Sequence, residues 1–544
     1  MRNPSPAASL LALSALVLLS TSCSVGVKVR EKWNDDLTRP LPLSDASRTW
    51  ATLQQGRTPS VDQLENYNRV VRGAVVQIAA NLQNESENLT VIQTDTGPVE
   101  IDVVSTGVDR LDLIDRAVPA EFVRIKDDDY FRSTVEIEGI GSSILVRQRP
   151  TSEDYLIPEN GLWYPLTAVL ELERQKPTLV LVDPTRDPVM RAGPREFPLS
   201  ANYTAAFARD FQDPQLVFFD LPALLRFEQF KDRLGVRRIS RFDPKKQAVI
   251  LAHGLYSSPE TWNQTLNELY AIPEIRERYE FWSFGYPSGA PIPYLALKFR
   301  ENLREMLAWR RANGAEIDSI VVVGHSMGGL LAKSVTSRSG RDNWDRLFNV
   351  PPDDLDVSNE SRQLIRDLVI FEPVDEIERV IFVATPHRGS SLADKRVVQL
   401  LSEVVQLPKT LLTASQEVVR ESRHALTPLG LELVRESPSS LAQLTASTRY
   451  TEGFFDTPLN PNVVYHSIIG KKQGPEVPLE ESTDNVVAYT SASIDGVASE
   501  TVIEDSKHGV HQTEGGIAEI ARILGAPRPD RITVALPLVM PEEE

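Results

Sequence analysis

A serine placed between a buried-strand pattern and a helix start constrains the fold of this chain more than any other feature. The apolar run 320–323 precedes Gly-His-Ser-Met-Gly at 324–328, and a helix-like segment, 329–333, follows. Such a strand-to-helix corner is a sharp turn that presents the serine hydroxyl, and its glycines are needed because a side chain would collide with neighbouring backbone. A bare Gly-x-Ser-x-Gly arises by chance in roughly one of ten chains of this length. With this context, the motif predicts that Ser326 is a nucleophile.

Further motifs follow in order along residues 245–524, about half of the chain. They are His253-Gly254-Leu255 with Ser258-Pro259 and Trp262, then Phe281 to Pro287, Ala384 to Ser390, Tyr465 to Gly470, Asp484-Asn485-Val486-Val487, and His508. Together with the serine motif they resemble serine-hydrolase lipoproteins of the α/β-hydrolase superfamily, in its lipase-like and GPI inositol-deacylase-like branch. The resemblance implies an α/β-hydrolase fold, a mostly parallel sheet flanked by helices, with helical cap insertions. That family usually has Asp-Gly-Val-Val where this chain has Asn485, a residue that tolerates left-handed backbone.

The general base is sought among seven histidines. In this fold the order along the chain is Ser, then Asp or Glu, then His. His508 and His511 both lie in the loop between the strand-like segment 500–505 and a final amphipathic helix, where the base is expected. Loop position and resemblance favour His508, and His511 is its rival. The other downstream histidines fit less well, because His387 comes too early, His424 lies in a charged helical stretch, and His466 sits inside a strand-like run.

The acid and the oxyanion donors are assigned by the same order. Asp484 follows the strand-like run that ends at Ile469 and precedes His508 by one short segment, while Asp394 and Asp495 are weaker rivals. His253 ends a hydrophobic strand about 70 residues before the serine and is interpreted as a brace for the oxyanion loop. The backbone N–H groups of Leu255 and Met327 are the expected oxyanion donors. Neither a metal nor an organic cofactor is expected.

The amino terminus predicts the location. A positive start is followed by a predominantly apolar region of thirteen residues, 7–19, and by small residues before Cys23, the only cysteine. This pattern resembles a bacterial lipoprotein signal peptide (1–22) with Cys23 as the lipid attachment site; ordinary cleavage or an uncleaved anchor are the alternatives. By the same resemblance, Ser24 favours the outer membrane of the bacterial cell envelope. A single cysteine excludes an intrachain disulfide, and no later apolar run is long enough to predict a transmembrane helix.

Charge and patterning divide the rest of the chain. A net charge of −18 argues against nucleic-acid binding and against attraction to anionic lipids, so the lipid on Cys23 should hold the protein at the membrane. We expect a polar tether (23–43), an α+β accessory domain (44–240), the α/β-hydrolase domain (241–526) and a C-terminal tail (527–544). Within the accessory domain, Ser60 and Gln63 predict a capping box at the start of a helix over 60–82.

Two helical insertions are expected, and the resemblance implies that the second either caps the pocket or packs on the core. The first contains Trp344 and Phe348, and the second spans 397–450. The predicted function is a membrane-anchored, exported serine esterase or lipase-like hydrolase of an ester or lipid substrate. An acyltransferase on the same residues and a non-catalytic envelope scaffold are the alternatives.

Overall fold

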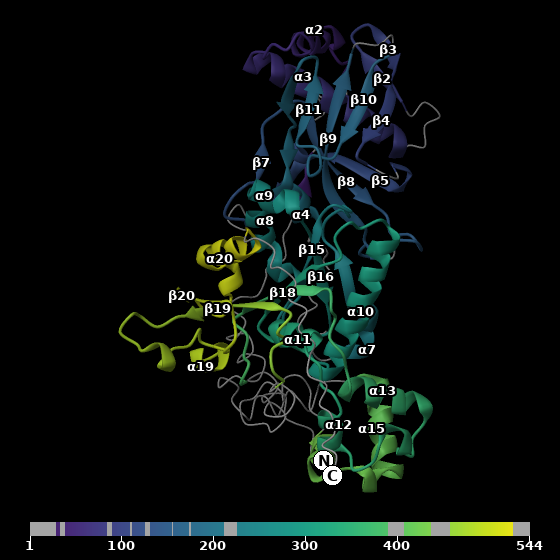
Figure 1. Ribbon diagram of the computed structural model, residues 1–544. Helices are drawn as coiled ribbons and strands as arrows, with labels where there is room; N and C mark the ends of the chain where they lie inside the picture. The colour runs from purple at the N-terminus through teal and green to yellow at the C-terminus, as the bar shows by residue number, and fades with distance from the viewer. Residues whose placement is uncertain are drawn as a thin grey trace, which may run out of the picture.

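The computed structural model describes residues 29–32, 39–83, 90–108, 111–125, 131–154, 156–172, 176–210, 226–389, 407–436 and 457–525. Within these ranges the chain forms a β-rich accessory module (residues 29–210) and an α/β domain (residues 226–525), one above the other in Figure 1. The signal sequence, Cys23, Asp394 and the tail 527–544 lie outside the described residues. None of the described helices is long and apolar enough to cross a membrane.

A seven-stranded sheet forms the centre of the α/β domain. Its strands, in spatial order, are β14 (Gly235–Arg238), β16 (Tyr279–Gly285), β15 (Gln247–Ala252), β17 (Ile320–His325), β18 (Ile377–Val383), β19 (Val464–Lys471) and β20 (Ser499–Glu504). Only the β14–β16 pair is antiparallel. Parallel strands need helical crossovers, and both faces of such a sheet are therefore covered. The predicted mostly parallel sheet flanked by helices is confirmed.

Alternate residues of the central strands face two different cores. On β17, Ile320 and Val322 point into one core with α10 (Ile292–Ala312) and α11 (Met327–Thr336). Val321 and Val323 point into the other, with α8 (Asn263–Ala271) and α20 (Glu514–Gly525). The period of two follows from the strand geometry. The second core continues into the accessory module, because Val118, Phe122 and Tyr203 belong to the same buried cluster.

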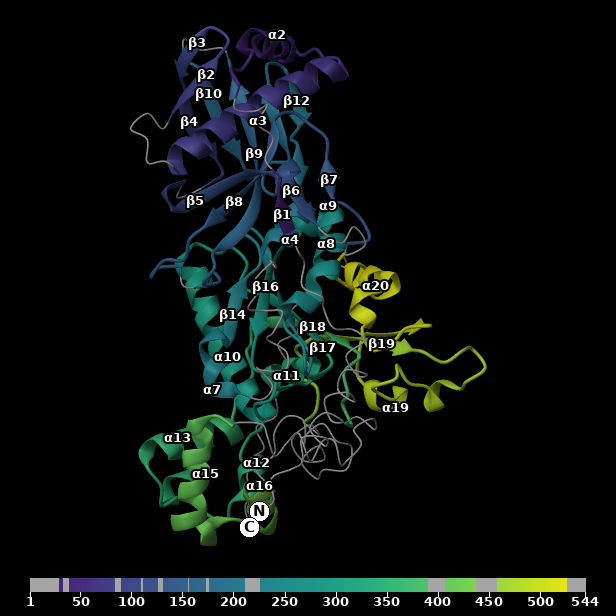
Figure 2. The same ribbon diagram turned by 180° about the vertical axis from the view of Figure 1, so that it is seen from behind.

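The accessory module is built on a five-stranded sheet covered by two helices. Its strand order is β4 (Asp102–Thr106), β10 (Thr178–Val182), β9 (Leu162–Glu171), β8 (Ser142–Gln148) and β5 (Ile114–Pro119). Helix α3 (Val61–Gln83) lies across this sheet, and α2 (Leu43–Gln54) packs beside it, with Trp50 stacked on Tyr67 (Figure 2). The predicted capping box is confirmed, since Ser60 N–H donates to Gln63 Oε1 and Gln63 N–H donates to Ser60 Oγ.

Small two-stranded sheets and one further helix complete the module. The pairs are β1 (Val29–Glu31) with β6 (Val123–Ile125), β2 (Val91–Thr94) with β3 (Gly97–Glu100), β11 (Val189–Ala192) with β12 (Arg195–Pro198), and β13 (Ala201–Asn202) with β7 (Glu136–Ile137). Helix α4 (Tyr203–Asp210) lies against β9 and against α8, where the module meets the α/β domain.

Two expected boundaries are wrong. The tether expected over 23–43 contains β1, in which Val29 is buried and Glu31 pairs with Arg116 and Arg209, so this segment is folded onto the module. The boundary expected at 240/241 falls too late, because β14 is already an edge strand of the large sheet. The short helix α7 (Phe227–Phe230), whose Phe227 is buried in the same domain, precedes it.

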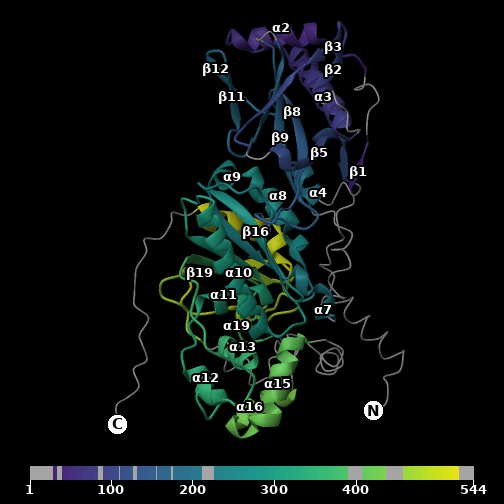
Figure 3. The same ribbon diagram turned by 90° about the vertical axis from the view of Figure 1, so that its right-hand side faces the viewer.

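Helical insertions extend the α/β domain on the side away from the accessory module (Figure 3). Their described helices are α12 (Asp342–Leu347), α13 (Asn359–Val369), α15 (Lys409–Glu421) and α16 (Pro428–Glu436). Trp344 and Phe348 are stacked and buried in the domain core, so these two residues pack the first insertion on the core. In the second insertion, Leu412 is partly exposed and Leu411 packs against the core. Residues 397–406 and 437–450 of that insertion lie outside the described residues.

Candidate active site

The corner between β17 and α11 is the sharp turn expected for a nucleophile. Ser326 has φ 54° and ψ −121°, a backbone conformation that a non-glycine residue rarely adopts. Its N–H donates to Val383 O at 2.8 Å, which fixes the turn to the neighbouring strand β18. A Cβ added at Gly324 would lie 2.5 Å from the backbone of Gly328, and one at Gly328 would lie 2.3 Å from Ala252 O. Both glycines are therefore required sterically, as predicted.

Ser326, His508 and Asp484 are joined in one hydrogen-bonded chain. His508 Nε2 lies 3.0 Å from Ser326 Oγ, and His508 Nδ1 lies 2.7 Å from Asp484 Oδ2. A carboxylate only accepts, so Nδ1 carries the ring proton of the neutral imidazole and Nε2 accepts from the serine hydroxyl. This is the arrangement in which a histidine can remove the proton of an attacking serine.

The loop that carries Asp484 holds the carboxylate rigidly. Its Oδ1 accepts from the N–H groups of Val486 at 2.8 Å and Val487 at 2.7 Å, which leaves Oδ2 for the histidine. Asn485 adopts φ 78°, the left-handed conformation anticipated for the residue that replaces glycine. Gly470, the second-last residue of β19, lies beside this loop, and a Cβ there would lie 3.1 Å from Asp484 Cβ and from Lys507 O. Gly470 ends one of the motifs named in the sequence, and its lack of a side chain lets the loop that carries Asp484 approach the loop that carries His508.

The expected oxyanion donors lie on two segments that meet at the nucleophile. A Cβ added to Gly254 would lie 3.1 Å from Ser326 Cβ, so the loop after β15 passes directly against the corner. Among the described residues, the N–H groups of Leu255 and Met327 have no hydrogen-bond partner. Two unpaired backbone donors beside a serine are what an oxyanion requires.

His253 anchors the loop after β15 through contacts with Tyr286. Its ring is stacked on Tyr286 with 4.0 Å between centroids, its Nε2 accepts from Tyr286 N–H, and its carbonyl accepts from the Tyr286 hydroxyl. Burial lowers the pKa of His253 to about 4, so this ring is neutral near pH 7. Its Nδ1 lies 2.9 Å from Gly254 O, so main-chain groups engage both ring nitrogens, and His253 fits the structural histidine interpreted from the sequence.

The remaining candidates lie elsewhere or serve another purpose. His387 is buried against Phe382, and His424 is exposed on a short 3₁₀ turn (Arg423–Ala425). His466 contacts Ser499 and Arg379 on the sheet, and Asp495 is exposed in a turn. None of these four side chains is hydrogen-bonded to Ser326 in the described structure. No cluster of three potential metal ligands occurs within the described ranges.

His511 is buried and contacts a different segment of the chain. Its Nε2 lies 2.8 Å from Thr261 Oγ1, in the 3₁₀ turn η5 (Pro259–Trp262) that follows the oxyanion loop. Burial, and after it the neighbouring ring of His508, lower the pKa of His511 to about 3. Of the two histidines that the sequence left open, His508 is therefore the one that contacts the candidate nucleophile.

A strand-turn-helix serine with a downstream carboxylate and histidine, set at the ends of a mostly parallel sheet, defines the class of α/β proteins with a nucleophile elbow. A sequence profile of the alpha/beta hydrolase family matches residues 249–520. The chain belongs to the alpha/beta hydrolase family, and it has the α/β-hydrolase fold with an additional N-terminal β-rich module. Comparison with curated proteins found no match.

Several solved structures match part of this chain at low sequence identity. Lipase BlEst2 of Bacillus licheniformis in its mature form is 14% identical, over 52% of this chain and 94% of that chain, with a TM-score of 0.30. EstA from Clostridium botulinum is 12% identical, over 58% and 98%, with a TM-score of 0.31. The monoacylglycerol lipase of Paleococcus ferrophilus is 13% identical, over 54% and 98%, with a TM-score of 0.30. Sequence identities and TM-scores this low do not indicate the substrate of this protein.

Proposed function

We propose that this protein hydrolyses carboxylic esters through an acyl-enzyme formed on Ser326. The observation that carries the proposal is the continuous chain from Asp484 through His508 to the Ser326 hydroxyl, with 2.7 Å and 3.0 Å at its two links. The two unpaired amides of Leu255 and Met327 beside the serine supply the remaining requirement of acyl transfer. Membership of the alpha/beta hydrolase family supports the same chemistry.

In the proposed reaction Ser326 Oγ attacks the ester carbonyl while its proton passes to His508 Nε2. Asp484 holds the ring in the reactive tautomer and stabilises the imidazolium. The carbonyl oxygen becomes an oxyanion held by the Leu255 and Met327 amides, each contributing roughly 3 kcal/mol in the transition state. Breakage of the ester C–O bond releases the alcohol, which takes the proton from His508. Water, deprotonated by His508, then attacks the acyl-enzyme carbonyl; the bond to Ser326 Oγ breaks, His508 returns the proton to Oγ, and the carboxylic acid is released.

The test uses a soluble form that lacks residues 1–23, a panel of aryl esters of increasing chain length, and a fluorophosphonate probe. We expect turnover and covalent labelling by the unchanged chain, and neither by Ser326→Ala, whose small change should leave the fold intact. An absence of labelling would contradict the nucleophile assignment and favour a non-catalytic scaffold. Labelling with acyl transfer to an added alcohol but no net hydrolysis would replace hydrolase by acyltransferase.

We also propose that a lipid on Cys23 attaches the protein to the cell envelope, at the outer membrane. The support is the apolar run 7–19 followed by small residues and the single cysteine. Cys23→Ala should abolish incorporation of a fatty-acid analogue and move the protein out of the membrane fraction. Retention of the unlabelled mutant in that fraction would mean that another contact holds it there.

A further inference from the structure

The residue before the nucleophile faces the loop that carries the candidate base. His325 is buried, and its Nε2 lies 2.9 Å from the backbone carbonyl oxygen of His508. A carbonyl oxygen only accepts, so Nε2 carries the proton and donates it. Nδ1 of the same ring is buried with no hydrogen-bond partner among the described residues. The proton-bearing nitrogen of His325 is therefore committed to the main chain of His508.

His325 is also packed against a second point of the same loop. Its ring centroid lies 4.0 Å from that of His511. His511 is held at its ring by Thr261 Oγ1, and at its carbonyl by Thr265 Oγ1 at 2.7 Å. Thr261 and Thr265 belong to η5 and α8, the segment that follows the oxyanion loop. The β17–α11 corner, the loop that carries His508 and His511, and the segment η5–α8 thus meet at the buried rings of His325 and His511.

The His325 ring keeps one protonation state, which preserves its hydrogen bond to the His508 carbonyl. Burial and, after it, the neighbouring rings of His511 and His508 hold the pKa of His325 well below its usual value. The ring stays neutral at the pH at which esterases are assayed, because a second ring proton would have no acceptor in the described surroundings. The donor to His508 is consequently present throughout that range.

We propose that His325 is a positioning residue for the base: by donating from Nε2 to the His508 carbonyl and packing on His511, it sets the distance between His508 Nε2 and Ser326 Oγ. This inference rests on the proposed function of the same site. It assigns a task to the residue inside the serine motif, which the mechanism above leaves unused. A displacement of the base by about 1 Å can lower the rate on the order of 10²-fold, so loss of this contact should lower kcat measurably.

The test compares His325→Gln with His325→Met, two side chains of equal length of which only glutamine can donate. We expect kcat for an aryl ester to fall about 10- to 100-fold in His325→Met and to stay within about fivefold in His325→Gln, with KM within about threefold in both. His424→Ala, an exposed histidine on the second insertion, is the control and should leave kcat unchanged. Melting temperatures show that the variants fold, and His325→Ala replaces the methionine variant if that one does not.

A second readout does not need turnover. In protein labelled with ¹⁵N-histidine, the His508 ring, assigned by its loss in His508→Ala, should show Nδ1 protonated in the unchanged chain and in His325→Gln. Its signals should broaden or shift towards a mixture of tautomers in His325→Met. Such a change without esterase activity in the unchanged chain would overturn the proposed function and keep the positioning role. Equal kcat and equal His508 signals in the glutamine and methionine variants would overturn the positioning role.

Discussion

At the scale of single residues, Asp484 has both carboxylate oxygens committed. Oδ1 accepts from two backbone N–H groups and Oδ2 accepts from His508 Nδ1. In Asp484→Asn the amide oxygen would take the backbone donors, and the NH₂ group would then face His508. The histidine would be forced into the tautomer whose protonated Nε2 cannot accept from Ser326. We expect kcat to fall by about 10³- to 10⁴-fold.

The same variant should fold normally, because its backbone hydrogen bonds survive. The melting temperature and the kinetics of purified Asp484→Asn would be measured beside Asp495→Asn, which alters an exposed turn and should behave like the unchanged chain. Near-normal turnover in Asp484→Asn would show that another group orients the base.

Which residues could be predicted from the sequence depends on how local their signal is. Ser326 and Asp484 lie in short motifs with strand and turn patterns beside them, so their places followed from chain order. The contact of His325 with His508 joins residues 183 positions apart, and the sequence analysis missed it, because no local pattern reports which way a side chain leaves a turn. His508 and His511 are three positions apart in one loop, so only the backbone path of that loop could separate their roles.

At the scale of elements, the corner between β17 and α11 depends on close backbone approach. Gly324→Ala would place a methyl group 2.5 Å from the carbonyl of Gly328 and from Gly329 N, atoms that cannot move without unwinding the helix start. We expect a loss of about 3 kcal/mol or more in the free energy of unfolding, together with loss of activity. Urea denaturation measures the first and ester turnover the second.

Gly525→Ala is the matched control for that change. Gly525 ends α20, and a Cβ there would meet nothing within 4 Å. The variant should unfold within about 0.5 kcal/mol of the unchanged chain. Equal stability of Gly324→Ala and Gly525→Ala would mean that the corner tolerates a side chain and is less tightly packed than described.

Long periodic elements were predictable and short ones were not. The helix over 60–82 and its capping box match α3, and the final amphipathic helix matches α20, with Ile517, Ile520, Ile523 and Leu524 all buried. Strand β1 has three residues, of which only Val29 is buried, so its sequence shows no periodic pattern that distinguishes it from a tether. Strand β14 has the sequence Gly-Val-Arg-Arg and belongs to the large sheet through pairing with β16, a tertiary contact that a local pattern does not reveal.

At the scale of the whole molecule, buried neutral histidines make stability depend on pH. Burial lowers the pKa of His466 to about 4, whereas in the unfolded chain it has its ordinary value of about 6.5. As pH falls below 6.5, His466 becomes protonated in the unfolded chain but stays neutral in the folded chain. The free energy of unfolding therefore falls progressively down to about pH 4. Each such histidine contributes up to about 1.4 kcal/mol per pH unit in this window.

The prediction is checked by urea denaturation at pH 7.5 and at pH 5. His466→Gln, which removes one such group away from the candidate active site, should reduce the difference between the two measurements. His424→Gln, at an exposed position, should leave the difference unchanged. A larger difference in His466→Gln would contradict the assignment of a neutral ring in the folded state.

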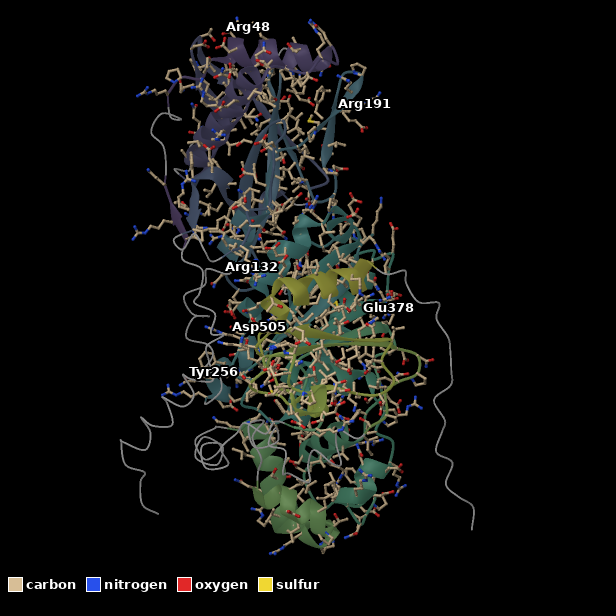
Figure 4. The ribbon with its side chains drawn as sticks, turned by 90° about the vertical axis from the view of Figure 1, so that its left-hand side faces the viewer. Arg48, Arg132, Arg191, Tyr256, Glu378 and Asp505 are labelled. Carbon is tan, nitrogen blue, oxygen red and sulfur yellow. The ribbon has the colours of Figure 1, made fainter. Side chains whose placement is uncertain are left out.

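Finally, the accessory module and the α/β domain share one hydrophobic core and a set of buried polar contacts. Asp183, directly after β10, pairs with Arg241, which follows β14, and the two side chains are only 1% and 9% exposed. Thr204 and Ser133 of the module bind Asn267 on α8, and Arg132, labelled at the junction in Figure 4, donates to Gln512 O. These contacts reach α8 and Gln512, which lie next to the loop that carries His508. We therefore expect the accessory module and the α/β domain to unfold together.

Asp183→Ala would leave the buried Arg241 guanidinium without its carboxylate and should lower the free energy of unfolding by about 3–5 kcal/mol. Loss of the exposed pair Arg341–Asp345 in Asp345→Ala should cost less than about 1 kcal/mol.

In both variants, urea denaturation followed by tryptophan fluorescence and by far-UV circular dichroism should give one coincident transition, because the hydrophobic core crosses the boundary between the accessory module and the α/β domain. Two separated transitions, with Asp183→Ala shifting only one, would show that the module folds independently and that its contacts with α8 do not support the base loop.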